Sequence, residues 1–271
     1  MGKIIAFANQ KGGVGKTTTC VNMSAYMALM GKKVLLIDID PQGNASTGLG
    51  VDKAKKDLVT IYDVISENVD IVDAIQKTEI PGLDIIPTNS DLSGAETELV
   101  YMKDRETVIK RALAKIKNSY DFITIDCPPS LAQLTVNALT AANGVIIPIQ
   151  CEFFALEGLS QLMNTIRLIK KTGLNPTLGI EGVVLTMRDT RSNLGRQVAE
   201  EVSKFFGSTI FSTTIPRNIR LAESPSYGQP IYLYDKTCVG SIAYLKLVEE
   251  YFDRNNIEYK KLTRKKEFKK K

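Results

Sequence analysis

The sequence predicts an α/β fold in which a mainly parallel sheet is covered by helices on both faces. Short apolar runs alternate with longer segments of helical period along most of the 271 residues. This alternation is typical of parallel sheets with crossover helices. The first run, residues 3–9 (KIIAFAN), is mostly apolar without polar alternation, which indicates a strand buried on both sides. Because the pattern stops near Arg254, we expect one domain over residues 1–254.

The expected elements follow in a regular order. A helix over residues 16–30 has an apolar face that includes Val21, Met23 and Met27, and Gly31 is a plausible stop. Residues 44–60 show no clear period, so we expect a mobile surface segment there. Further strands are expected at 34–37, 83–86, 122–125, 144–149 and 180–186, further helices at 94–117, 155–171, 194–206 and 239–252, and short apolar segments at 210–215 and 231–233.

The loop after the first strand has the spacing of a phosphate-binding loop. Residues 11–18 read KGGVGKTT, which completes the standard pattern except that Gln10 takes the place of the first glycine and Lys11 is an additional lysine. Glycines let backbone N–H groups close around a phosphate, and the N-terminus of the next helix favours negative charge. Strand, loop and helix together predict a P-loop NTPase domain. The nucleotide-binding residues expected here are Gly12, Gly13, Val14, Gly15, Lys16, Thr17 and Thr18.

Acidic residues end two of the expected strands. Asp38 and Asp40 follow the strand at 34–37, and Asp126 follows the strand at 122–125. Ligands of α/β sheets bind outside the carboxyl ends of the strands, so these carboxylates point to the same place as the loop. Lys16 would reach the β- and γ-phosphates, Asp40 would orient an attacking water, and the Mg²⁺ candidates are Thr17, Asp38 and Asp126. The expected cofactors are ATP and Mg²⁺.

With these residues in place, the chain resembles the ParA/Soj-type chromosome and plasmid partition ATPases, in the deviant-Walker group that also contains MinD. The resemblance covers residues 1–254 and rests on NQKGG at 9–13, DIDPQGN at 38–44, DCPPS at 126–130, QCE at 150–152 with ALEGL at 155–159, and IPRN at 215–218. The last two groups are the most specific, since the first three are partly shared across the wider group.

The resemblance implies roles for individual residues. Lys11 matches the signature lysine, which contacts the partner's phosphates in an ATP-bound sandwich dimer and so also counts as nucleotide-binding. Lys11, Lys16, Asp40 and Asp126 match the residues required for hydrolysis. The segment beside the adenine is matched by Pro216, Arg217 and Asn218.

The resemblance also implies a cycle and its partners. Family members hydrolyse ATP slowly, bind nonspecific double-stranded DNA as the ATP dimer, and release it after hydrolysis stimulated by a ParB/Spo0J-type centromere-binding protein. A cytoplasmic, nucleoid-associated protein is therefore expected.

Candidate DNA contacts lie in two loops late in the domain. Residues 186–196 (TMRDTRSNLGR) contain Arg188 and Arg191, and residues 215–225 contain Arg217 and Arg220. The resemblance suggests that Arg191 and Arg220 face DNA. Because the sequence contains no evident base-reading module, we expect contacts to phosphates only.

The positive charge of the chain is concentrated at its C-terminus. Residues 255–271 contain eight Lys or Arg and two Glu, whereas the whole chain has a formal net charge of only +5. This segment is too polar to be expected in a core, so we expect a basic, disordered tail. An auxiliary contact with DNA phosphates and a membrane-surface helix, with Tyr259, Leu262 and Phe268 as its apolar side, are the other interpretations.

Composition narrows the remaining alternatives. The chain has no His, which excludes histidine-based catalysis and metal ligation, and its four Cys show no zinc spacing. No apolar run approaches 18 residues, so a soluble protein is expected, and no signal peptide follows Met1, so a cytoplasmic one is expected. Two other functions remain open: a MinD-like membrane-cycling regulator of division-site placement, and a metabolic or redox P-loop protein resembling dethiobiotin synthetase or the nitrogenase iron protein.

Overall fold

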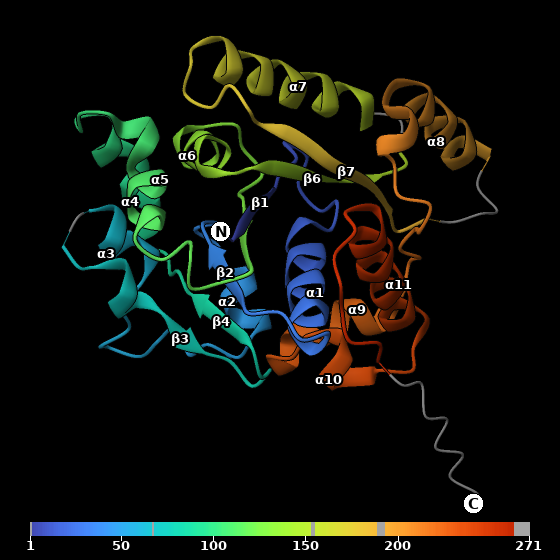
Figure 1. The fold of residues 1–271 in the computed structure, drawn as a ribbon, viewed down its shortest axis with the longest axis horizontal. Coiled ribbons are helices and arrows are strands. Elements are labelled where there is room, and N and C mark those ends of the chain that lie inside the picture. Colours follow the sequence, from blue (N-terminus) through green and yellow to red (C-terminus); the bar gives the residue numbers. More distant parts are fainter. Residues whose placement is uncertain (1, 67, 153–154, 189–192, 263–271) are drawn as a thin grey trace, which may run out of the picture.

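The computed structural model describes residues 2–66, 68–152, 155–188 and 193–262. Within these residues one sheet of seven strands has the order β3-β4-β2-β5-β1-β6-β7 (Figure 1). All neighbouring strands are parallel except the edge pair β3 and β4. The predicted mainly parallel sheet is therefore confirmed. The strands are β1 Lys3–Phe7, β2 Val34–Asp38, β3 Gln76–Lys77, β4 Leu83–Ile86, β5 Phe122–Asp126, β6 Gly144–Gln150 and β7 Gly179–Thr186.

Helices cover both faces of this sheet. They are α1 Lys16–Leu29, α2 Asn44–Gly48, α3 Ile61–Ile65, α4 Leu92–Leu99, α5 Val108–Ala114, α6 Gln133–Ala141, α7 Ala155–Lys171, α8 Asn193–Phe206, α9 Ile219–Glu223, α10 Ile231–Asp235 and α11 Val239–Arg254.

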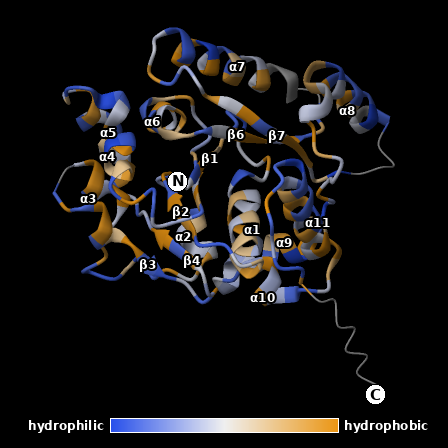
Figure 2. Cartoon of the chain, viewed as in Figure 1, coloured by the Kyte–Doolittle hydropathy of each residue, from blue (hydrophilic) through white to orange (hydrophobic). Residues whose placement is uncertain are grey.

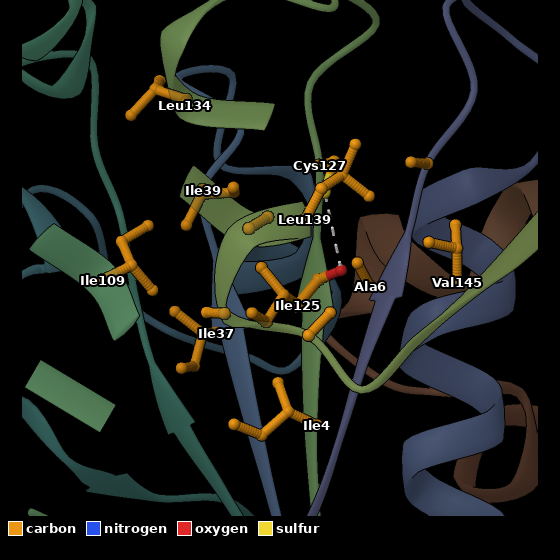
Figure 3. Packing of buried hydrophobic residues seen from close by; sticks show 14 of the residues in the cluster. Ile4, Ala6, Ile37, Ile39, Ile109, Ile125, Cys127, Leu134, Leu139 and Val145 are labelled. Carbon is orange, nitrogen blue, oxygen red and sulfur yellow. Dashed lines mark hydrogen bonds between the residues drawn. The ribbon is translucent and has the colours of Figure 1, made fainter. Parts of the chain in front are cut away.

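The alternation of side chains along each strand divides the core into two clusters. Ile4 and Ala6 of β1 pack with residues of α3 to α8, whereas Ile5 and Phe7 pack on the other face with residues of α1, α2 and α9 to α11. Figure 3 shows the first cluster, and Figure 2 shows apolar residues along the central strands. Because both faces are covered, the strands read as continuous apolar runs, and their carboxyl ends are left free to form a site.

Some helical segments differ from the expectations. Residues 44–60 are not one mobile surface segment, because residues 44–48 form α2 and its Ser46 is fully buried, donating hydrogen bonds to Asp38. The helix expected over 94–117 is interrupted: α4 ends at Leu99, and Asp104 has a positive φ of 52° that ends regular helix before α5. Helices α3, α6 and α9 were not expected, and α9 lies within residues 215–225, which were expected to be a loop.

The segment after Arg254 contacts the domain. Ile257, Tyr259 and Leu262 pack against the second core cluster, and the backbone N–H of Lys260 donates to the carbonyl of Met30 at 3.0 Å. The expectation that residues 255–271 are too polar to pack is therefore wrong for this first part. Residues 263–271 lie outside the described part of the chain. Among the described residues, no helix combines the length and apolar character needed to cross a membrane.

Candidate nucleotide-binding site

The loop between β1 and α1 is held in one shape by its glycines and by its neighbours. Gly13 and Gly15 have φ values of 73° and 84°, in the left-handed region that favours glycine. Val14 is buried, and its carbonyl accepts a hydrogen bond of 2.7 Å from the hydroxyl of Thr186 at the end of β7. Thr186 was not predicted from the sequence. This hydrogen bond links the loop to β7, the strand at one edge of the sheet.

The loop opens onto a cleft of about 540 Å³ at the carboxyl ends of the strands. Asp40, from the segment after β2, lies on the same cleft. The opposite wall comes from residues 221–230, around the 3₁₀ turn Ser224–Tyr227. The loop residues in its lining are Gly12, Gly13, Gly15, Lys16, Thr17 and Thr18. The structure therefore brings together most of the predicted nucleotide-binding residues.

A second cavity of about 380 Å³ adjoins the cleft and has five lining residues in common with it. Pro216, Arg217 and Asn218 line this second cavity, as a base-binding segment next to a phosphate loop would. The side-chain oxygen of Asn218 is buried and has no hydrogen-bond partner. The shared residues are Gly15, Thr18, Met187, Leu221 and Ala222.

Lys16 is the cation at the base of the cleft. Its ammonium donates to the carbonyl of Lys11 at 3.0 Å, and only 6% of the residue is exposed. Burial lowers the pKa of Lys16, and the carboxylates of Asp126 and Asp40 oppose this shift. A phosphate in the cleft would supply the negative charge that this buried ammonium favours.

Asp38 and Asp126 are neighbours on adjacent strands, at matching positions of β2 and β5. Both oxygens of Asp38 accept hydrogen bonds, from the N–H and hydroxyl of Ser46 and from the N–H of Asp40. Burial raises the pKa of Asp38 to about 6, with these hydrogen bonds opposing the shift. Asp38 was predicted as a metal ligand, a role that stays a prediction. In this structure its oxygens hold α2 and the Asp40 segment.

Asp126 differs from Asp38 because neither of its oxygens has a partner at normal hydrogen-bond geometry, although both are buried. Burial raises the pKa of Asp126 well above its usual range, and Asp38 adds to this. The hydroxyl of Thr17 and the ammonium of Lys16 partly offset the shift. A buried carboxylate that lacks a partner beside a phosphate loop fits a magnesium ion with bound water. Thr17 and Asp126 are the residues that would hold such an ion.

Replacing Asp126 with Asn should stabilise the nucleotide-free protein by about 1–3 kcal/mol near neutral pH, because folding then no longer requires an ionised carboxylate to take up a proton or to be buried without a partner. Thermal unfolding followed by circular dichroism at pH 7.5 checks this. The control is Asp57→Asn, which removes a carboxylate that is exposed and paired with Lys55. The same variant should lose the extra stabilisation that Mg²⁺ gives in the presence of ATP. A lower melting temperature for Asp126→Asn would contradict this account of Asp126.

The same burial predicts how stability depends on pH. The folded protein keeps protons on Asp38 and Asp126 at pH values where the unfolded chain has lost them, so its stability falls as pH rises. For Asp38 this fall lies between about pH 4 and about pH 6. The fall should be smaller in Asp126→Asn, because one of the two groups no longer titrates.

Asp40 lies at the cleft on a tightly held segment. Only 6% of it is exposed, and one carboxylate oxygen accepts the N–H of Gln42 at 3.0 Å. The ammonium of Lys53 donates to the carbonyl of Gln42 at 2.9 Å and further fixes this segment. Its second oxygen and its position on the lining suit a group that orients water against a bound phosphate.

Lys11 is a predicted nucleotide contact that does not line this cleft. Its ammonium lies 2.6 Å from a carboxylate oxygen of Glu152, and about a third of its side chain is exposed. Only its carbonyl, through Lys16, takes part in the site. Glu152 had been singled out only as part of a motif, without a role.

The structure places only some of the four arginines predicted to contact DNA near one another. Arg188 pairs with Pro216 in a parallel bridge, which places it next to the exposed Arg217. Arg220 is exposed on α9, but its guanidinium is paired with Glu223. Arg191 lies outside the described residues.

The cleft wall formed by residues 221–230 was missed by the sequence interpretation. Its lining includes Leu221, Ser224, Pro225, Gln229 and Pro230, none of which carries a nucleotide-binding motif. The only local signal is the clustering of Pro225, Gly228 and Pro230, which indicates a turn and not a ligand.

The chain is similar to known proteins over most of its length. The family described as "AAA domain" matches residues 2–180. The chain is 57% identical over 250 residues to the sporulation initiation inhibitor protein Soj of Bacillus subtilis, covering 92% of this chain and 98% of that protein. It is 53% identical over 254 residues to the chromosome partitioning protein ParA of Caulobacter vibrioides, covering 93% of this chain and 94% of that one.

A solved structure extends the similarity to the fold. Cobyrinic acid a,c-diamide synthase from Mycobacterium smegmatis, solved with bound ADP and magnesium, has a TM-score of 0.81 to this chain at 35% identity. The match covers 97% of this chain and 100% of that one. The similarity to Soj and ParA is higher in identity and covers nearly the whole chain.

Proposed function

The chain belongs to the ParA/Soj family of chromosome-partitioning ATPases, and from this premise we propose that it is an ATP-driven switch for DNA segregation. Two ATP-bound copies form a sandwich dimer that binds nonspecific double-stranded DNA. Hydrolysis, slow in the isolated protein, ends the dimer and releases the DNA. The protein is proposed to be cytoplasmic and associated with the nucleoid. Its hydrolysis of ATP serves to switch it from the DNA-bound dimer to the DNA-free form.

The observation that carries the proposal is that the two lysines of the loop occupy different positions. Lys16 is buried at the base of the cleft, whereas Lys11 extends out of it toward Glu152. A lysine at the rim of its own cleft is suited to contact the phosphates of a facing copy, as an arginine finger supplied in trans does. Lys11 therefore completes the partner's site, and hydrolysis requires the dimer.

The other residues act on the same nucleotide. Thr17 and Asp126 would hold a Mg²⁺ ion, which would neutralise phosphate charge, and Asp40 would orient the attacking water. The cavity lined by Pro216, Arg217 and Asn218 receives the adenine. A ParB/Spo0J-type centromere-binding protein is the proposed activator of hydrolysis.

DNA contact is proposed for Arg188, Arg191, Arg217 and Arg220. Replacing Arg220 with Ala should weaken the ATP-dependent binding of random-sequence duplex DNA. The slope of log K against log salt should fall in magnitude by about 0.9, because one phosphate contact is lost. Fluorescence anisotropy across a salt titration measures both quantities.

The matched control for this prediction is Arg167→Ala. Arg167 is exposed on α7, on the far side of the sheet from α9 (Figure 1). ATP affinity should be unchanged in both variants. Equal effects of the two substitutions, or an unchanged slope for Arg220→Ala, would remove Arg220 from the contact surface.

Membrane cycling of the MinD type is the competing function, and the packing of the C-terminal segment disfavours it. A membrane-surface helix would need Tyr259 and Leu262 on its apolar side, yet both pack against the domain core. Sedimentation with anionic liposomes, with and without ATP, separates the two functions. ATP-dependent co-sedimentation would favour membrane cycling over the DNA switch.

A further inference from the structure

The short helix α9 has one side at the nucleotide cleft and another at the surface. Leu221 and Ala222 line both the cleft and the adjoining cavity. Arg220 and Glu223, three residues apart, lie together on the outer side, and their side chains are 50% and 36% exposed. A single turn of helix therefore connects the wall of the nucleotide site with a proposed DNA contact.

The guanidinium of Arg220 is surrounded by groups that neutralise it. One of its nitrogens lies 3.0 Å from Glu223, and another lies 3.9 Å from Asp235 on α10. The guanidinium also lies over the ring of Tyr234, at 6.0 Å from its centre, and the hydroxyl of Tyr234 donates to the same oxygen of Glu223 at 2.9 Å. Two carboxylates thus surround one cation.

This arrangement is unfavourable for DNA binding. A phosphate that approaches Arg220 meets a local excess of negative charge from Glu223 and Asp235, and the guanidinium would have to leave its partners. In the conformation described here, Arg220 is a poor phosphate contact.

Two of the three partners of Arg220 lie on another helix, α10, whereas Glu223 lies on α9 with Arg220 and is itself held by Tyr234. Helix α10, which carries Tyr234 and Asp235, is tied to α1 by a hydrogen bond of 2.8 Å from the N–H of Ile231 to Asn22. Leu221 and Ala222 of α9 line the cleft, as does the next residue, Ser224, whereas no residue of α10 itself does; the cleft reaches α10 only at Pro230, which precedes it, and at its anchor Asn22. A nucleotide that fills the cleft would therefore contact α9 directly.

We propose that α9 is a latch between the nucleotide site and the DNA surface: Glu223, Tyr234 and Asp235 hold Arg220 in the nucleotide-free protein, and ATP binding against Leu221 and Ala222 releases it. The proposal rests on the proposed DNA-binding function, which it deepens by making Arg220 available only in the ATP state. Such a shift needs a ligand with different contacts in the two states, and the cleft side of α9 supplies them.

The test compares Glu223→Gln with Asp70→Asn. Asp70 pairs with Lys115, away from α9, and Asn can keep the hydrogen bond that Asp70 accepts from Val72. Each substitution removes one negative charge and frees one cation. Binding to random-sequence duplex DNA is measured without nucleotide, with ADP, and with AMP-PNP and Mg²⁺, over a range of salt.

Glu223→Gln should raise DNA affinity about three-fold or more without nucleotide and with ADP, with a salt slope steeper by about 0.9. With AMP-PNP it should match the wild type, because Arg220 is already released. Asp70→Asn should match the wild type throughout. The latch is overturned by a gain that is equal in all nucleotide states, by a gain that Asp70→Asn shares, or by no gain.

A second measurement does not depend on DNA. The side-chain Nε–H of Arg220, assigned by comparison with Arg220→Lys, is followed by NMR as AMP-PNP and Mg²⁺ are added. A move toward the position of a solvent-exposed guanidinium supports the latch even if the wild type fails to bind DNA, a failure that would refute the proposed function alone. An unchanged resonance overturns the latch even if DNA binding is ATP-dependent.

Discussion

Replacing Asp40 with Asn should lower the rate of ATP hydrolysis about a hundred-fold or more while leaving ATP affinity within about two-fold. Asp40 lies on the cleft lining, and Asn retains an oxygen that can accept the N–H of Gln42. The segment should therefore keep its shape and lose only the negative charge that orients water. Phosphate release under saturating ATP, together with equilibrium ATP binding, separates the two effects.

The control is Asp52→Asn, which removes a carboxylate from the same part of the chain without touching the cleft lining. Its turnover should equal that of the wild type. Wild-type turnover in Asp40→Asn would exclude the proposed role, and an equal loss of ATP binding would make Asp40 a binding residue instead.

Replacing Lys16 with Ala should weaken ATP binding about a hundred-fold or more, because a buried ammonium on the lining of the proposed phosphate site is lost. Calorimetric titration with ATP and Mg²⁺ measures the affinity. Since Lys16 also offsets the charge of Asp126, the melting temperature of the variant is measured first. If Lys16→Ala does not fold, the titration is made with Lys16→Gln, which retains more of the side-chain volume.

Lys11→Ala is the matched control, as it removes the other lysine of the same loop. The Lys11 side chain points to Glu152, and only its carbonyl meets Lys16. ATP affinity should therefore survive in Lys11→Ala, whereas dimer formation and turnover should not. If the two variants lose ATP affinity equally, the assignment of one lysine to each copy is wrong.

The strands and the phosphate loop could be predicted because their signals are local. A strand buried on both faces is a continuous apolar run, as at Val34–Asp38, and a phosphate loop needs glycines at fixed positions. Acidic residues at two strand ends point to one edge of the sheet without any knowledge of tertiary contacts.

The short helices could not be predicted, because tertiary contacts stabilise them. Helix α2 has five residues and depends on the hydrogen bonds between Ser46 and Asp38. Helix α3 is the exception, because it begins at a capping box of Thr60 and Asp63 that is visible in the sequence itself. Short helices have little stability of their own and depend on tertiary contacts. Five residues are also too few for a helical period to be recognised in the sequence.

The site predicted from the sequence was incomplete because tertiary contacts also bring its other parts together. The wall at residues 221–230 reaches the loop through the fold, since Asn22 of α1 holds the N–H of Ile231. The pairing of Lys11 with Glu152, and that of Arg220 with Asp235, also joins residues from different segments. Sequence spacing can propose a charged residue as a contact, but only the fold shows which opposite charge already neutralises it.

In the proposed cycle, ATP controls DNA binding through the domain itself and not through the basic C-terminal segment. The most direct measurement is binding to random-sequence duplex DNA with ATP, with ADP and without nucleotide, for the full chain and for a variant that ends at Leu262. This end point keeps the packed residues Ile257, Tyr259 and Leu262 and removes six of the basic residues that follow. The account predicts ATP-dependent binding that survives the truncation. Binding that ignores the nucleotide and vanishes with residues 263–271 would contradict it.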